Sequence, residues 1–185
     1  MKKLFRPYLA AFLLGSLLFT TACSDDDPEP VEEGEMITSM TISLVSQGKA
    51  PQPVTATYSD IDGPGGNAPV VGPLNLTAGT TYDAVITFSD DRSGGAGDIT
   101  PEIRQEGVDH EVFFVANPTT LLSTTKTDTD ANGRPIGLTA TVTTTNAGTG
   151  TLTVTLKHQP GLKGATSDAN KGETDVQATF PVTIQ

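Results

Sequence analysis

The chain has 185 residues, of which 36% are hydrophobic and 5% aromatic, and it carries a formal net charge of −11 at pH 7. This length suits one domain with a real core, flanked by short terminal segments. The acidic charge repels nucleic-acid phosphates and anionic lipid headgroups, so nucleic acid is excluded as a natural partner. Cations and basic proteins remain candidates.

The first 22 residues have the pattern of a secretory signal peptide. Three bases among the first six residues precede an apolar run from Leu9 to Phe19, and small residues follow that run. The run is too short to cross a bilayer core, which needs about twenty apolar residues. We therefore expect residues 1–22 to be removed during export.

Cys23 is the only cysteine in the chain and comes directly after the expected signal peptide. The segment from Phe19 to Cys23 resembles the lipobox of bacterial lipoproteins, although Thr20 stands where leucine is usual. We expect lipidation of Cys23, with several acyl chains holding the protein on a membrane. A buried free thiol is the alternative.

Residues 23–35 contain seven acidic residues, no basic residue and almost nothing apolar. Such a segment cannot bury enough surface to offset its ordering entropy, so we expect a disordered tether. It also resembles the acidic tract that follows the lipidated cysteine in surface-exposed lipoproteins of the Bacteroidota. That resemblance implies localisation at the outer membrane, with the protein exposed on the cell surface.

Residues 36–185 show the alternation of apolar and polar residues that is typical of β-strands. The alternation is clearest at Leu138–Thr143, Leu152–Leu156 and Val176–Ile184, and the turn residues at 146–150 predict a hairpin between the first two. Weaker strands are predicted at residues 36–46, 54–59, 70–76, 82–88, 111–116 and 121–127. We expect an all-β domain built as an antiparallel, immunoglobulin-like two-sheet sandwich, with a small barrel as the alternative.

One short helix is predicted among the strands. Thr100 is a suitable N-cap, Pro101 suits the first helical position, and Gly107 suits the end of the last turn. We expect one or two helical turns lying over an end of the sandwich.

Several short segments are similar to those of an uncharacterised group of Bacteroidota lipoproteins, often labelled "type 1 periplasmic binding fold superfamily". These segments are residues 60–63, 67–69, 106–114, 128–133, 156–160 and 172–175. The resemblance implies a protein that works beside an outer-membrane nutrient receptor. The fold in that label does not suit this chain, because a two-lobed α/β protein needs alternating helices and strands over a far longer sequence.

Asp128, Asp130, Asn132 and Gly133 match the start of a calcium-binding loop, in which oxygen ligands on alternate residues converge. The match then fails, because Thr139 stands where a bidentate glutamate is required. An Asn-Gly pair between apolar segments is also typical of a tight turn. A plain turn and a weak cation site therefore both remain open here. The same alternatives apply to Asp60, Asp62 and Asn67.

The chain has two histidines, and each lies at the end of a predicted strand. His158 shares the parity of the core-facing residues of its strand, which places it at the rim of the core. His110 opens another strand, four residues after Glu106. Imidazole and carboxylate together are suitable ligands for zinc or a similar transition metal, so His110, His158 and Glu106 form a candidate metal site. Two separate histidines, half-buried or solvated, are the alternative.

No sequence motif of a nucleophilic, metal-dependent or phosphate-binding enzyme is present, so we expect that the protein is not an enzyme. The sequence favours a surface lipoprotein that binds a ligand or a metal as an accessory of an outer-membrane nutrient uptake system. A structural or adhesive cell-surface module is the alternative.

Overall fold

The protein is described by a computed structural model, which covers residues 36–48, 51–63 and 65–185. These residues lie in one compact unit. The expected signal peptide, lipidated Cys23 and acidic tether fall on residues 1–35 and lie outside the described residues. None of the described helices is long and apolar enough to span a membrane.

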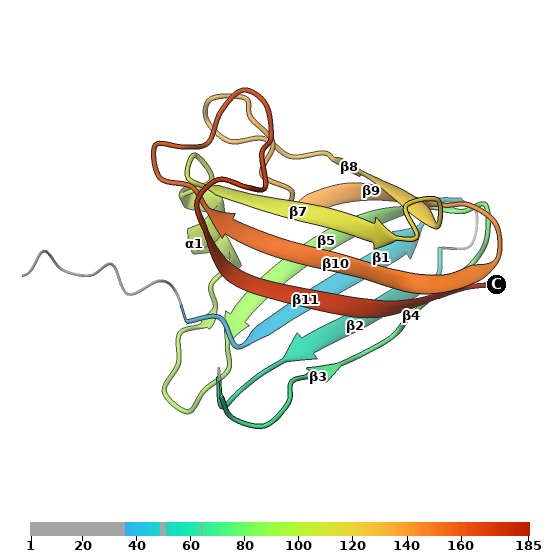
Figure 1. Cartoon of the computed structure of the whole chain (residues 1–185), viewed down its shortest axis with the longest axis horizontal. Helices are drawn as coiled ribbons and strands as arrows, with labels where there is room; N and C mark the ends of the chain where they lie inside the picture. Colours follow the sequence, from blue (N-terminus) through green and yellow to red (C-terminus); the bar gives the residue numbers. More distant parts are fainter. Residues whose placement is uncertain (1–35, 49–50, 64) are drawn as a thin grey trace, which may run out of the picture. The chain divides into compact units, whose positions relative to one another are not determined.

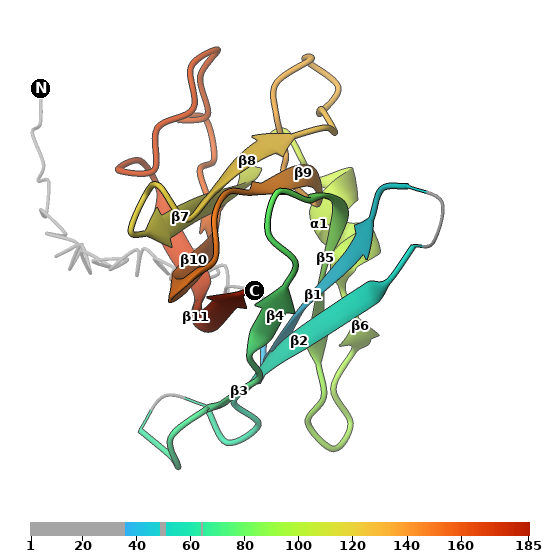
Figure 2. The same cartoon turned by 90° about the vertical axis from the view of Figure 1, so that its right-hand side faces the viewer.

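Two β-sheets face each other across one core (Figures 1 and 2). In the first sheet the strand order is β3-β2-β1-β5-β9-β8, and β6 pairs with β5. Its strands are β1 (Ser39–Ser46), β2 (Pro53–Ser59), β3 (Val70–Val71), β5 (Thr81–Asp90), β6 (Gly97–Asp98), β8 (Leu122–Lys126) and β9 (Thr139–Thr144). All pairings in this sheet are antiparallel.

The second sheet has the order β4-β11-β10-β7. Its strands are β4 (Leu74–Leu76), β7 (His110–Asn117), β10 (Gly148–His158) and β11 (Glu173–Ile184). The pairs β10–β11 and β10–β7 are antiparallel, whereas β4 runs parallel to β11. Over the described residues neither sheet closes on itself, so the predicted two-sheet sandwich is confirmed in preference to a barrel.

The core is built from the residues that the alternation assigns to it. Leu152, Val154 and Leu156 of the second sheet are fully buried. Leu138, just before β9, and Val142 of β9 are also fully buried. In β11 the buried residues are Val176, Ala178, Phe180, Val182 and Ile184. Burial of these apolar side chains supplies the main favourable free energy of folding.

The predicted hairpin between Leu138–Thr143 and Leu152–Leu156 is wrong. Strand β9 pairs with β5 and β8 in one sheet, whereas β10 pairs with β7 and β11 in the other. The turn at residues 145–147 therefore carries the chain from one sheet to the other. Both strands point apolar residues into the same core, and alternation alone does not distinguish strands that pair from strands that face each other.

The single strand predicted at residues 70–76 is divided in two. Strand β3 adds to β2 in the first sheet, and β4 adds to β11 in the second. Gly72 and Pro73 separate them, and the Gly72 N–H still donates to the Thr57 carbonyl oxygen of β2 at 2.9 Å. Proline cannot donate to a sheet ladder, so the chain leaves the first sheet at this point.

The short helix α1 (Thr100–Gln105) forms at one end of the sandwich, in contact with β5 and just before the start of β7 (Figure 1). Ile99, and not Thr100, occupies the N-cap position. The Thr100 hydroxyl instead bonds to the backbone of Phe88 in β5, accepting from its N–H at 2.9 Å. Ile103 is fully buried and attaches the helix to the core.

Candidate functional site

The two histidines meet at the end of the second sheet. His110 and His158 are directly opposite each other in the pairing of β7 with β10. Their rings stack with centroids 4.7 Å apart and planes inclined by 13°. His110 is buried, whereas His158 is half-buried at the rim. The sandwich thus holds two imidazoles side by side.

Asp175 joins this pair from the neighbouring strand β11. The Asp175 Oδ2 lies 3.8 Å from the His110 Nε2, and the Asp175 side chain is only 10% exposed. Among the described residues this oxygen has no hydrogen-bond partner. Burial raises the pKa of the Asp175 carboxyl to about 6, against the opposing effect of His158. An unpartnered buried carboxylate beside two imidazoles is the most unusual polar feature of this end of the fold.

A β-bulge places Asp175 in this position. In the β10–β11 ladder Leu156 pairs with Val176, but the next residue, Lys157, pairs with Thr174. Asp175 is therefore the extra residue of the bulge, without a partner in β10. A bulge changes the direction of the side chain that it carries, and bulges occur frequently beside functional sites. Regular alternation from the inward-facing Val176 assigns Asp175 to the outer face, which is why sequence reasoning missed it.

The other ring nitrogen of His110 faces helix α1. The Nδ1 lies 3.3 Å from the carbonyl oxygen of Glu106. A carbonyl only accepts, so this bond requires the proton of the neutral ring on Nδ1 and leaves a lone pair on Nε2. Burial, together with the charge of His158, lowers the pKa of His110 and favours this neutral ring.

Glu106 itself lies on the far side of that ring. Its Oε2 is 3.9 Å from His110 Nδ1, and its side chain is 51% exposed. The carboxylate that faces the free Nε2 is Asp175, from β11. Over the described residues, no three His, Cys, Asp or Glu side chains converge on one point as metal ligands. The predicted set of His110, His158 and Glu106 is thus not assembled as a three-ligand centre.

A buried lysine connects the loops that cover this end of the sandwich. The Lys163 ammonium lies 3.0 Å from Asp130 Oδ2, and both side chains are 1% exposed. It also donates to the carbonyl oxygens of Gly107 and His110, at 2.5 Å and 3.0 Å. Three oxygen atoms therefore surround the ammonium. These bonds tie the loop 159–172 to the loop 127–138 and to the residue that opens β7.

The carboxylates of the candidate calcium loop are engaged with protein donors. Asp128 accepts from the amides of Gly137 and Leu138, at 2.7 Å and 3.0 Å. Asp130 Oδ1 accepts from the amides of Asn132 and Arg134. Burial opposes ionisation of Asp130, but the hydrogen bonds from Arg134 and Lys163 hold its pKa below the usual value. This geometry fits the turn alternative, with Lys163 as the cation of the loop.

In the second acidic loop Asp62 and one oxygen of Asp60 also have protein donors, whereas Asp60 Oδ1 has none among the described residues. Asp62 Oδ2 accepts from the backbone and the side-chain amide of Asn67, at 2.8 Å and 2.6 Å. The Tyr58 hydroxyl donates to Asp60 Oδ2 at 3.3 Å. These bonds are those of a tight surface turn.

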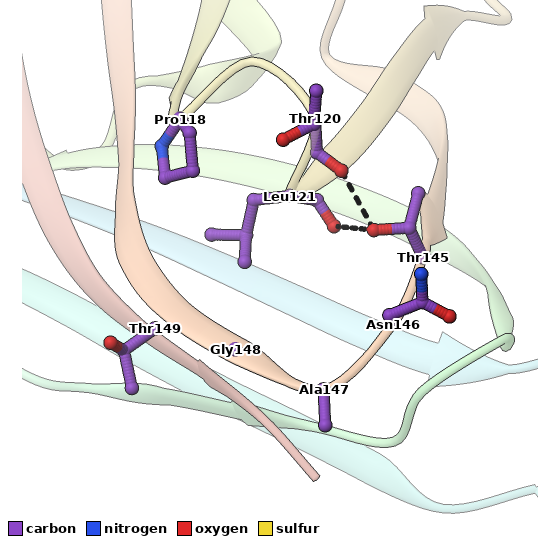
Figure 3. A pocket seen from close by; sticks show the side chains of 8 residues that line it. All are labelled: Pro118, Thr120, Leu121, Thr145, Asn146, Ala147, Gly148 and Thr149. Atoms are coloured by element: carbon purple, nitrogen blue, oxygen red, sulfur yellow. Dashed lines mark hydrogen bonds between the residues drawn. The ribbon is translucent and has the colours of Figure 1, made fainter.

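A hollow lies near Pro118, where β7 ends and β10 begins (Figure 3). It is lined by Pro118, Thr120, Leu121, Thr145, Asn146, Ala147, Gly148 and Thr149. The Thr145 hydroxyl lies 2.7 Å and 2.9 Å from the carbonyl oxygens of Thr120 and Leu121, so its proton is already used within the protein. No ionisable side chain lines this hollow, which makes it a weaker candidate than the histidine site.

Comparison of the chain with protein-family models, with curated proteins and with solved structures finds no match. The assignment of a function therefore depends on the chemistry of the residues themselves.

Proposed function

We propose that this protein is a lipid-anchored cell-surface binding protein, without enzymatic activity, that serves as an accessory of an outer-membrane nutrient uptake system. The anchor is Cys23, which follows the apolar run and precedes the acidic tether. The compact β domain is the part that meets the ligand.

The observation that carries the binding role is the buried Asp175 carboxylate, which faces the His110 ring without a hydrogen-bond partner among the described residues. Burial of an unpartnered carboxylate costs stability. Ionisable groups whose pKa is perturbed by burial cluster at functional sites. The half-buried His158 beside this pair lies at the rim, where an entering ligand reaches it.

The threonine-rich outer faces of both sheets favour the alternative of a structural or adhesive module. Cross-strand hydroxyl pairs such as Thr41–Thr57 and Thr153–Thr179 bond to each other at 3.0 Å. Such faces satisfy their own polar groups, as a passive spacer requires. They do not account for Asp175, so we place binding first.

Two measurements test the proposal. Cells producing the wild type, Cys23→Ala or the control Ser24→Ala are labelled with a fatty-acid analogue and fractionated. We expect Cys23→Ala alone to lose label and membrane recovery, and unchanged recovery of that variant rules out the anchor.

Native mass spectrometry of the wild type, released gently from membranes, should show a bound small ligand or metal ion. A ligand-free mass favours the structural alternative.

A further inference from the structure

Two electron-pair donors face each other in the site with no donor proton between them. His110 carries its ring proton on Nδ1, which bonds to the Glu106 carbonyl, and therefore presents a lone pair from Nε2. Asp175 Oδ2 is 3.8 Å away and, among the described residues, has no hydrogen-bond partner. Such a pair needs a cation or a bridging water between the two atoms, or a proton taken up by one of them.

The separation of these atoms suits a metal ion better than a direct hydrogen bond. A charge-assisted bond between nitrogen and a carboxylate oxygen spans about 2.7–2.9 Å. Zinc binds imidazole nitrogen and carboxylate oxygen at about 2.0–2.2 Å each, so an ion between the two atoms bridges a gap of this size at a wide angle.

The support of the His110 ring also matches that of a metal ligand. Ligating histidines generally donate their second ring N–H to a carbonyl or a carboxylate, which fixes both the tautomer and the orientation of the ring. In this protein the Glu106 carbonyl occupies that position, and helix α1 holds it there. The exposed Glu106 carboxylate lies on the same side, 3.9 Å from Nδ1, and therefore away from the metal-facing nitrogen.

We propose that a divalent transition-metal ion of the zinc type binds between His110 Nε2 and Asp175 Oδ2, with His158 as the third protein ligand. The inference rests on the proposed binding function and names its ligand class. The His158 ring is stacked flat on that of His110, so it must rotate to turn a nitrogen toward the gap. His158 is half-buried at the rim, so this rotation does not move a fully buried ring. Imidazole ligands favour zinc and its neighbours over calcium and magnesium.

Calorimetric titration with zinc chloride tests the proposal. The full-length chain is used with Cys23→Ala, which removes the only thiol, and without a polyhistidine tag. We expect one zinc ion per chain and no saturable heat with magnesium. Asp175→Asn has nearly the same shape as the wild type and should weaken zinc binding by more than about 100-fold, beyond the loss typical of residues that only orient a ligand. His158→Ala should also weaken it.

Glu106→Gln is the matched control, because sequence reasoning assigns the carboxylate ligand to Glu106. We expect this variant to bind zinc as the wild type does. Absence of saturable heat in the wild type overturns the proposal, as does zinc binding that survives Asp175→Asn. Denaturant unfolding of each variant shows whether it is folded. Failure of this titration is distinct from failure of the proposed function, because the fatty-acid labelling and native mass measurements do not depend on zinc.

Discussion

His110 and Asp175 are far apart in the chain, yet His110 Nε2 and Asp175 Oδ2 face each other at 3.8 Å, at one end of the sandwich. The His110 side chain is 4% exposed and that of Asp175 is 10% exposed. Without a bound cation, the fold therefore buries a carboxylate against a neutral imidazole. The cost of this arrangement is measurable in the metal-free protein.

Asp175→Asn should stabilise the metal-free protein at pH 8 by about 1–2 kcal/mol, since it removes a buried charge that solvent screens only in part. Burial raises the pKa of Asp175 from 3.8 to about 6. The folded state therefore holds this proton more tightly than the unfolded state, and stability decreases as the pH rises through that interval. The advantage of the variant should disappear at pH 4. Urea unfolding with a chelator present measures the difference in stability between the variant and the wild type. A variant that is less stable than the wild type at pH 8 contradicts the argument.

Strand alternation predicts the faces of the strands and the positions of the histidines. The parity of Leu152, Val154 and Leu156 carries on to His158 at the rim, where the structure places it opposite His110. These inferences succeed because a strand that is buried on one face must repeat every second residue.

The same pattern does not predict which strands pair or where a ladder is interrupted. Strands β9 and β10 read as a hairpin but lie in opposite sheets. The bulge at Asp175 has no local signature, because it arises from the ladder between two strands that are distant in the chain. Lys163 lies in a polar loop, and its burial depends on three acceptors that only the folded chain brings together.

The assignment of faces in β10 is tested by two neighbouring substitutions. Val154 is fully buried, and Val154→Asp should destabilise the protein by several kcal/mol, enough to unfold a domain of ordinary stability. Thr153 points outward and bonds to Thr179 at 3.0 Å, so Thr153→Asp should cost less than about 1 kcal/mol. Circular dichroism during urea titration compares the stabilities of the two variants. Equal losses of stability refute the assignment of inward and outward faces in β10.

Asp90 gives the protein a component of stability that acid removes. Arg92 holds this carboxylate with two bonds, at 2.8 Å and 2.7 Å, and they lower its pKa to about 2 from the ordinary 3.8. A lowered carboxyl pKa stabilises the folded state above pH 3.8, and this contribution is lost as the pH falls through 2. Asp90→Asn should therefore lower the melting temperature at pH 7 and have little effect near pH 2. Asp91→Asn, at the exposed neighbouring position, serves as the control and should have little effect at either pH.

The ion pair of Lys163 with Asp130 should be the most sensitive polar contact of the site. Both side chains are 1% exposed, and Lys163 also binds the carbonyl oxygens of Gly107 and His110. Lys163→Met leaves Asp130 charged, buried and without its ammonium partner, which should cost about 3–5 kcal/mol. Adding Asp130→Asn to Lys163→Met removes the stranded charge and should recover part of that loss, so the two substitutions are not additive. The exposed Lys171→Met should change stability by less than about 0.5 kcal/mol. Chemical unfolding of the two single variants and the double variant measures the coupling, and strict additivity of the losses shows that the pair does not hold the two loops together.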